Sequence, residues 1–254
     1  MRAVELGSPA CRLRFHDLRG AGVPLLFVHG LGCAGSHDYP AVAADPALAD
    51  RRRLLVDLLG SGFSDRPLDF AYTVDAHAGT LRALLDALAL ESVDVYGHSM
   101  GGAAAIALAA SCGRRVRRLA LSEPNLDPGG GTSSRAIARF DEREYVERGQ
   151  RRIALEAVRA GGREWAASLE RSLPQAMHRA AVSLVEGSAP TWRELLARLP
   201  MPRTVIFGAR SLPDPDTERL KTPGVQVRVV PDCGHAMAWE NPAGLAAAIR
   251  ESLA

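Results

Sequence analysis

The sequence predicts an α/β fold, with a mostly parallel, doubly wound sheet and an inserted helical cap. Three observations support this prediction. Short apolar runs alternate with helical patterns through most of the chain, these runs end in Gly, Asp, Ser or Glu, and one long segment interrupts the alternation. The length of 254 residues suits one domain with an insertion better than two equal domains.

The expected strands are continuous apolar runs, a pattern typical of strands buried on both faces of a parallel sheet. They cover residues 24–30, 52–60, 92–99, 116–124, 203–209 and 225–235. The segment CRLRFHDL (11–18) instead alternates, which predicts an antiparallel edge strand or hairpin. Helical patterns occupy residues 73–90, 101–112 and 241–254.

The interruption runs from Asn125 to Leu199 and contains only helical patterns. It opens with the Gly/Pro/Ser-rich stretch PNLDPGGGTSS. Helical stretches follow at about 134–149, 151–160, 163–172, 174–186 and 190–199. We therefore predict a core of residues 1–124 and 200–254 and a cap of residues 125–199. Such a cap would cover the carboxyl ends of the strands, where open parallel sheets bind ligands.

Composition narrows the partners that we expect. The formal charge of +2 is too small to predict nucleic-acid or anionic-membrane binding. No apolar leader or membrane-length run is present, so we expect no membrane insertion and a cytoplasmic location. The four cysteines (Cys11, Cys33, Cys112 and Cys233) and the histidines lack metal-ligand spacing, so we expect reduced thiols, no metal and no cofactor. Nothing in the sequence predicts an oligomeric state.

A serine at a strand-to-helix corner is the first candidate for chemistry. Ser99 lies in Gly-His-Ser-Met-Gly, between an apolar strand and an Ala-rich helix. Gly97 and Gly101 would let the strand and helix approach closely at a strained turn. The N–H of Met100 would then face a developing oxyanion. The alternative interpretation is a serine whose side chain caps a buried helix.

Other strand ends carry polar or glycine-rich turns. The stretch FVHGLG (27–32) would direct the Leu31 N–H to the same oxyanion, and PDCGHAMAWENP leaves His235 after the last strand. Asp57 precedes the glycine-rich loop LLGSGFSD, where it either supports the loop or contacts a substrate. Together with the Ser99 motif, these segments in this order resemble the α/β-hydrolase fold family from about Pro24 to the C-terminus. The resemblance implies Ser99 as nucleophile and His235 as general base.

The carboxylate of the catalytic triad is less clear, because the chain departs from the family's usual pattern. The family usually places its acid after the strand that precedes the histidine strand. Residues 210–212 are Arg-Ser-Leu there, and the first carboxylate is Asp214. Glu123 ends the strand before the cap, a position that some family members use. We predict Glu123 as the acid and Asp214 as the alternative, with Asp216 and Asp232 also open.

Glu123 also has a purely structural interpretation, an ion pair with a cap arginine such as Arg135. A serine nucleophile implies acyl transfer, so we predict hydrolysis of a carboxylic ester, lactone or thioester of small to medium apolar size. A C–C bond hydrolase, a cofactor-free perhydrolase and a non-catalytic binding protein remain alternatives. Haloalkane dehalogenases and epoxide hydrolases carry Asp at the position of Ser99, and the latter also need two cap tyrosines, whereas this cap has only Tyr145.

Side chains near the motifs are candidates for the wall of a substrate pocket. Asp38, Tyr39 and Trp239 are those that we expect there. The cap supplies large apolar side chains, each expected to belong to a core before a ligand site: Trp165, Leu169, Met177, Leu184 and Trp192. An apolar underside would suit a hydrophobic acyl group.

Overall fold

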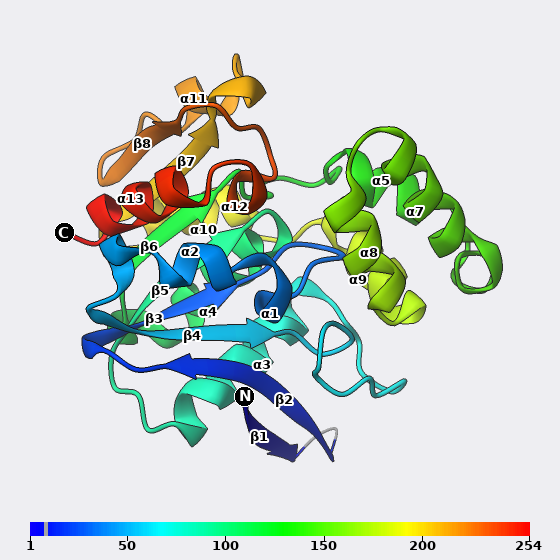
Figure 1. Ribbon diagram of the computed structural model, residues 1–254, viewed down its shortest axis with the longest axis horizontal. Helices are drawn as coiled ribbons and strands as arrows, with labels where there is room; N and C mark the ends of the chain where they lie inside the picture. The colour runs from blue at the N-terminus through cyan, green and yellow to red at the C-terminus, as the bar shows by residue number, and fades with distance from the viewer. Residues whose placement is uncertain (8–9) are drawn as a thin grey trace.

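The computed structural model describes residues 1–7 and 10–254, which form one eight-stranded sheet with helices on both faces (Figure 1). The strands follow the order β1-β2-β4-β3-β5-β6-β7-β8. Their bounds are β1 (Arg2–Gly7), β2 (Ala10–Leu18), β3 (Ala21–Val28), β4 (Arg51–Asp57), β5 (Val93–His98), β6 (Val116–Ser122), β7 (Arg203–Gly208) and β8 (Val225–Val230). The pairs β1–β2 and β2–β4 are antiparallel and the others are parallel. The α/β prediction is confirmed, as is the N-terminal hairpin, whose connecting residues 8–9 lie outside the described residues.

Strand β3 shows why the apolar runs have no polar alternation. Leu26 and Val28 belong to the core on one face of the sheet, and Leu25 and Phe27 to the core on the other. All four side chains are fully buried, so both faces of the strand require apolar residues.

The register of the central strands brings their carboxyl ends to one rim. Val28 of β3 pairs with Gly97 of β5, and His98 of β5 pairs with Ser122 of β6. Residues that follow these strands therefore emerge side by side. In Figure 1 the arrowhead of β4 points toward this rim, on the side where the cap lies.

Helices cover both faces of the sheet. On one face α3 (Val74–Ala87) packs on α4 (Met100–Cys112), and on the other α2 (Pro40–Ala44) packs on α13 (Pro242–Ser252). The shorter elements of the core are α1 (Gly35–Asp38), η1 (Pro46–Leu48), η2 (Gly113–Arg115), η4 (Ala209–Ser211), α11 (Asp216–Arg219) and α12 (Met237–Glu240). The sequence patterns did not predict α1 and α2. Of the helices in the described residues, none combines the length and the apolar character that a membrane crossing needs.

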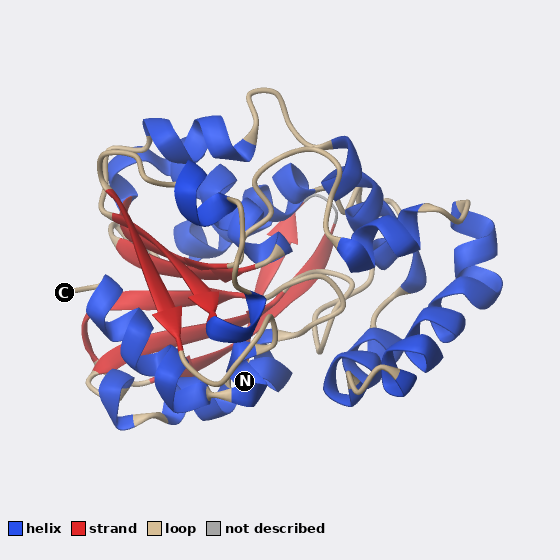
Figure 2. Cartoon of the chain, turned by 90° about the horizontal axis from the view of Figure 1, so that it is seen from above, coloured by secondary structure: helices blue, strands red, loops and turns tan. Residues whose placement is uncertain are grey.

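Most of the inserted segment forms a helical lobe beyond one end of the sheet (Figure 2). Its elements are α5 (Thr132–Ala138), α6 (Glu142–Glu144), η3 (Tyr145–Gly149), α7 (Gln150–Arg159), α8 (Arg163–Arg171), α9 (Pro174–Glu186) and α10 (Trp192–Arg198). The prediction of continuous helix over 134–149 is wrong, because Asp141 accepts a hydrogen bond from the N–H of Glu144 and caps a new helix there. The last helix, α10, packs on α4 of the core. The division into core and cap at residues 124/125 and 199/200 stays a prediction.

Candidate active site

Ser99 occupies a strained corner between β5 and α4. Its backbone angles are φ 53° and ψ −119°, a region that residues with a side chain rarely adopt. A Cβ at Gly97 would lie 2.5 Å from the Gly101 carbonyl oxygen, and one at Gly101 would lie 2.4 Å from the Val28 oxygen. The Ser99 side chain makes no capping hydrogen bond, so the helix-cap interpretation is wrong.

The hydroxyl of Ser99 has one polar neighbour that the sequence patterns missed. Its Oγ lies 3.5 Å from Oδ1 of Asn125, and the Asn125 N–H donates to the Ser99 carbonyl at 3.3 Å. The side-chain contact is at the outer limit of a hydrogen bond, so the hydroxyl stays available to another partner. The signal in the sequence was a polar residue two positions after Glu123, beyond the end of β6.

His235 and Glu123 meet although 112 residues separate them. The distance from His235 Nδ1 to Glu123 Oε2 is 2.7 Å, and the Gly208 N–H donates to Glu123 Oε1 at 3.0 Å. Burial acts to raise the pKa of Glu123, but the hydrogen bond and charge of His235 and the Gly208 N–H together hold that pKa below its ordinary value. Glu123 also has a positive φ of 38°, so this strand end is strained as well.

Among the hydrogen bonds of the described residues, none joins another candidate carboxylate to His235. Asp214 Oδ1 accepts from the Asp216 N–H at 2.7 Å, which closes the turn before α11. Arg135, the possible ion-pair partner of Glu123, donates to a glycine carbonyl in the loop before α5. Among the hydrogen bonds of the described residues, the carboxylate that contacts His235 is therefore that of Glu123.

Polar side chains at the ends of β5 and β6 form a series of hydrogen bonds next to His235. Ser122 Oγ lies 2.7 Å from the Tyr96 hydroxyl and 3.0 Å from His98 Nδ1. The rings of His98 and His235 are 4.6 Å apart, centroid to centroid. Burial, together with the charge of His235, lowers the pKa of His98 to about 3. His98 is therefore neutral at ordinary pH and adds no positive charge beside His235.

The turn after β3 lies against Ser99. A Cβ built at Gly30 would be 3.3 Å from the Ser99 Cβ, so the backbone of this turn is in contact range of the serine. Leu31 is the next residue. Met100 is the first residue of α4, where a backbone N–H has no acceptor within the helix. The structure thus places the turn that carries Leu31 and the first residue of α4, Met100, next to Ser99, and their role as oxyanion donors stays a prediction.

A cavity of about 710 Å³ opens above this rim and is lined by Ser99 and His235. Asp38, Tyr39 and Trp239 also line it. The Trp239 Nε1–H donates to Asp38 Oδ1 at 2.8 Å, which links the segment after His235 to α1. Burial acts to raise the pKa of Asp38, but hydrogen bonds from His37, Trp239 and a backbone N–H lower it overall, so this wall carries a carboxylate.

The cap supplies the opposite wall. Trp165 and Leu184 line the cavity, as do residues 132–134 at the start of α5. Leu169, Met177 and Trp192 are almost completely buried and are not among the lining residues. The expectation that the large cap side chains form core is therefore confirmed for these three, whereas Trp165 and Leu184 also reach the cavity.

The cavity wall carries several acidic side chains. Of the described residues that line it, none is lysine or arginine, whereas six are carboxylates: Asp38, Glu123, Asp127, Glu164, Asp214 and Asp216. Arg193, behind the wall, pairs with Asp127 and Asp216. In the described part of the chain, no group of three or more metal-ligating side chains is placed to hold a metal ion.

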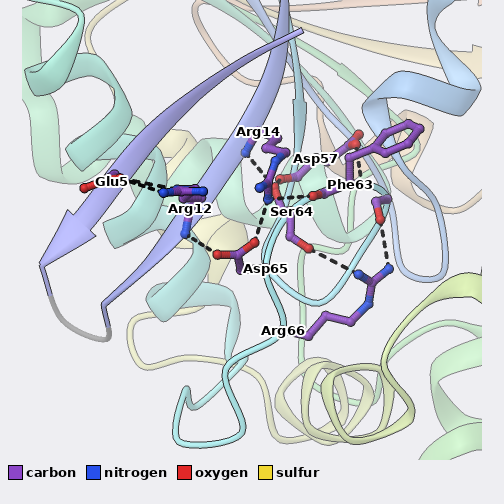
Figure 3. A network of polar contacts seen from close by, with 9 residues as sticks. Glu5, Arg12, Arg14, Asp57, Phe63, Ser64, Asp65 and Arg66 are labelled. Atoms are coloured by element: carbon purple, nitrogen blue, oxygen red, sulfur yellow. Dashed lines mark hydrogen bonds and ion pairs between the residues drawn. The ribbon is translucent and has the colours of Figure 1, made fainter.

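Asp57 supports a loop. Its carboxylate accepts from the N–H and hydroxyl of Ser36, both at 2.8 Å, and from the Phe63 N–H at 2.9 Å. Figure 3 shows Asp57 beside Phe63 and Ser64, with Ser64 bonded in turn to the backbone of Arg14. Asp57 is fully buried and is not among the cavity residues, which agrees with the scaffolding interpretation.

Comparisons with known proteins identify the family of the chain. Residues 23–242 match the α/β-hydrolase fold family. The chain is 40% identical over 125 residues to 2-hydroxymuconate semialdehyde hydrolase of a Pseudomonas species, a match that covers 46% of this chain and 41% of the relative. It is 40% identical over 114 residues to 2-hydroxy-6-oxo-2,4-heptadienoate hydrolase of Pseudomonas putida, covering 42% and 38%. The chain thus spans about two fifths of the length of these curated relatives.

A solved structure matches along the full chain. It is that of a thermophilic esterase from Thermogutta terrifontis, 27% identical, with a TM-score of 0.84 and coverage of 100% of this chain and 98% of that one. Because the family match covers most of the sequence, the chain belongs to the α/β-hydrolase fold family. The similar proteins thus include an esterase, a semialdehyde hydrolase and a dienoate hydrolase.

Proposed function

We propose that the protein hydrolyses an uncharged carboxylic ester through an acyl-enzyme on Ser99. The observation that carries the proposal is the 2.7 Å contact between His235 Nδ1 and Glu123, at a cavity that Ser99 also lines. A carboxylate can only accept, so Nδ1 carries the hydrogen and Nε2 keeps its lone pair. His235 is then a base for the Ser99 hydroxyl, and Glu123 holds the required tautomer and stabilises the charged imidazole.

The reaction proceeds in two halves. Ser99 Oγ attacks the ester carbonyl carbon while His235 Nε2 takes its proton, and the N–H groups of Leu31 and Met100 hold the oxyanion. The C–O bond to the alcohol breaks, and His235 returns the proton to the departing oxygen. Water, deprotonated by His235, then attacks the acyl carbon, the bond from that carbon to Ser99 Oγ breaks, and His235 returns the proton to Oγ as the carboxylic acid leaves. Lactones and thioesters would follow the same steps.

A C–C bond hydrolase is the second candidate, favoured by the identity to the two Pseudomonas hydrolases. The charge of the cavity favours an ester. A dienoate substrate carries a carboxylate, and the described lining residues offer it no lysine or arginine. Three acidic side chains on the wall, Asp38, Glu164 and Asp214, would repel it.

Turnover of p-nitrophenyl butyrate tests the proposal. Wild-type protein is expected to hydrolyse it, and Ser99→Ala to lower kcat by roughly 10⁴-fold or more. Ser133→Ala is the matched control, because Ser133 lines the same cavity but has no proposed part in the reaction. A fluorophosphonate should label wild type on the peptide that contains Ser99.

Two results would contradict the proposal. Cleavage of 2-hydroxy-6-oxo-2,4-heptadienoate with a kcat/KM well above that of every uncharged ester would favour the C–C hydrolase. No turnover of any ester, together with no fluorophosphonate labelling, would favour a binding protein that retains the scaffold.

A further inference from the structure

One hydrogen bond joins the cap to the turn after β3. The indole Nε1–H of Trp165, in α8, donates to the carbonyl oxygen of Leu31 at 2.8 Å, across 134 residues of sequence. Trp165 is only partly buried and lines the cavity. An indole N–H that is shielded from solvent usually finds an acceptor, and here the acceptor belongs to Leu31, whose own N–H is a proposed oxyanion donor.

Helix α8 also lies close to the backbone of Gly32, the residue after Leu31. Gly32 has φ +71°, and a Cβ there would lie 2.8 Å from the Trp165 Nε1 and 3.1 Å from a methyl group of Leu169. Side chains of α8 therefore rest directly on the peptide that links Leu31 to Gly32. Only glycine leaves room for them at this position.

The other side of Leu31 is held from the core. The Gly30 carbonyl, which belongs to the same peptide as the Leu31 N–H, accepts from His29 Nδ1 at 2.8 Å and from the Cys33 N–H at 3.3 Å. His29 Nε2 accepts from the Leu58 N–H at 3.0 Å, which fixes the hydrogen of His29 on Nδ1. Burial lowers the pKa of His29, consistent with this neutral form.

The two peptides that flank Leu31 are thus held by different parts of the molecule. The core holds the peptide before it through His29, and the cap holds the peptide after it through Trp165. An oxyanion donor works only when its direction is fixed before the charge develops. The Leu31 N–H belongs to the peptide that the core holds, and the next peptide, which shares the Leu31 Cα, accepts the hydrogen bond of Trp165 from α8.

We propose that Trp165 is a positioning residue, through which the cap sets the direction of the Leu31 N–H in the oxyanion hole. The inference rests on the proposed function, because it needs Leu31 as an oxyanion donor. The cap would then affect the rate of the chemical step, in addition to enclosing the substrate.

Trp165→Phe tests the proposal, because it keeps an aromatic ring on the turn and removes the N–H donor. We expect kcat for p-nitrophenyl butyrate to fall roughly 10-fold, as misplacement of a catalytic group does, with KM changed less than about threefold. Trp192→Phe is the matched control. Trp192 is buried in α10, and its Nε1 has no hydrogen-bond partner among the described residues, so the same substitution removes no bond. It should leave kcat within about twofold of wild type.

A second readout separates positioning from substrate binding. An alkylboronic acid forms a tetrahedral adduct on Ser99 that places an oxygen in the oxyanion hole. If Trp165 positions Leu31, the Ki of the boronic acid should rise in Trp165→Phe by about the factor by which kcat/KM falls. A raised KM with unchanged kcat and unchanged Ki would overturn the proposal, since Trp165 would then only bind substrate.

Failure of the inference and failure of the proposed function give different results. Ser99→Ala with wild-type turnover would remove the proposed function itself. Loss of turnover in Ser99→Ala, with equal kcat in Trp165→Phe and Trp192→Phe, would overturn only the role of Trp165. If Trp165→Phe does not fold, by circular dichroism and thermal unfolding, replacing Trp165 with 3-benzothienylalanine removes the N–H at nearly constant shape. The same 10-fold fall in kcat is then expected, and wild-type kcat would overturn the proposal.

Discussion

The rim of the sheet and the cap meet at one cavity but are built in different ways. At the rim, Ser99 and Glu123 have positive φ values of 53° and 38°, held by strands that are buried on both sides. Among the described residues of the cap, from α5 to α10, the positive φ values belong to glycines alone. Of the five non-glycine residues with positive φ in the described chain, two, Ser99 and Glu123, thus follow strands at the rim, and none lies in the amphipathic helices of the cap.

This difference suggests a division of tasks. Backbone contacts at the rim, such as those of Gly97 and Gly101, tolerate no side chain, so the geometry there has little freedom. The cap reaches the cavity through side chains such as Leu184, which can change size without changing the fold. We expect substitutions at the rim to affect the chemical step most and substitutions in the cap to affect substrate choice. Trp165 is the exception, because we propose that it affects the chemical step from the cap.

After that of Ser99 itself, the largest expected effect is at Glu123, the proposed triad acid on the rim. Glu123→Gln should lower kcat by roughly 10³- to 10⁴-fold, because the amide no longer fixes the tautomer of His235 or stabilises its charged form. Steady-state kinetics with p-nitrophenyl butyrate measure it. Asp214→Asn is the control and should stay within about threefold of wild type. The reverse pattern would make Asp214 the acid.

The next effect is on stability at the serine corner. Gly101→Ala should lower the free energy of unfolding by about 3 kcal/mol, because its Cβ would lie 2.4 Å from two backbone oxygens, those of Val28 and His29. Gly79→Ala in α3 is the matched control, since no atom lies within 4 Å of its Cβ. It should stabilise the protein by about 0.5–1 kcal/mol. Urea unfolding of both variants checks this, and equal effects would show that the corner is not tightly packed.

A smaller effect is expected for substrate choice in the cap. Leu184→Ala should enlarge the cavity and raise the ratio of kcat/KM for p-nitrophenyl hexanoate over acetate by about fivefold, roughly the discrimination given by one or two methylene groups. Leu196→Ala in α10 also removes a buried leucine, but one that does not line the cavity. An unchanged ratio in Leu184→Ala, or the same rise in Leu196→Ala, would mean that the cap side chains at the cavity do not select substrates by the length of the acyl group.

The last effect is on stability rather than on activity, and it is a pH dependence that comes from a buried histidine of the core. Burial lowers the pKa of His77 in α3 to about 3. Between that value and the ordinary 6.5 the unfolded chain binds a proton that the folded protein does not, so stability falls as pH falls through this range. His77→Leu should reduce the slope of the unfolding free energy by about 1.4 kcal/mol per pH unit there.

Urea titrations from pH 7 to pH 4 measure that slope. Leu85→Ala, a non-titrating change in the same helix, controls for lowered stability. A slope in His77→Leu equal to that of wild type would show that His77 is protonated in the folded protein.

The sequence predicted the rim better than the cap, for a physical reason. The strand predictions lie within a few residues of β3 to β8, apart from the last, which ran on into the loop before His235. For β3 to β7 the reason is burial on both faces, which requires a continuous apolar run. The expectation of burial on both faces is wrong for β8, an edge strand in which Val227 and Val229 are exposed. The glycines around Ser99 were informative because close backbone approach leaves few residue types possible.

The features that were missed depend on contacts between distant segments. The contact of Asn125 with Ser99 and the bond from Trp165 to Leu31 join different elements, and no local pattern predicts them. The break at residues 139–141 and the short helix α1 are local, but the tertiary environment decides them. For these segments, the local sequence is compatible with more than one secondary structure, and packing against the rest of the protein decides which one forms.

The central claim is that Ser99, His235 and Glu123 act as one catalytic unit. Residues that act as a unit lose their effects together, so the variants are not additive. We predict that Ser99→Ala combined with Glu123→Gln has the same kcat as Ser99→Ala alone, within about twofold. A double variant that loses the product of the two single effects would show that Glu123 and Ser99 contribute independently, and would contradict the claim.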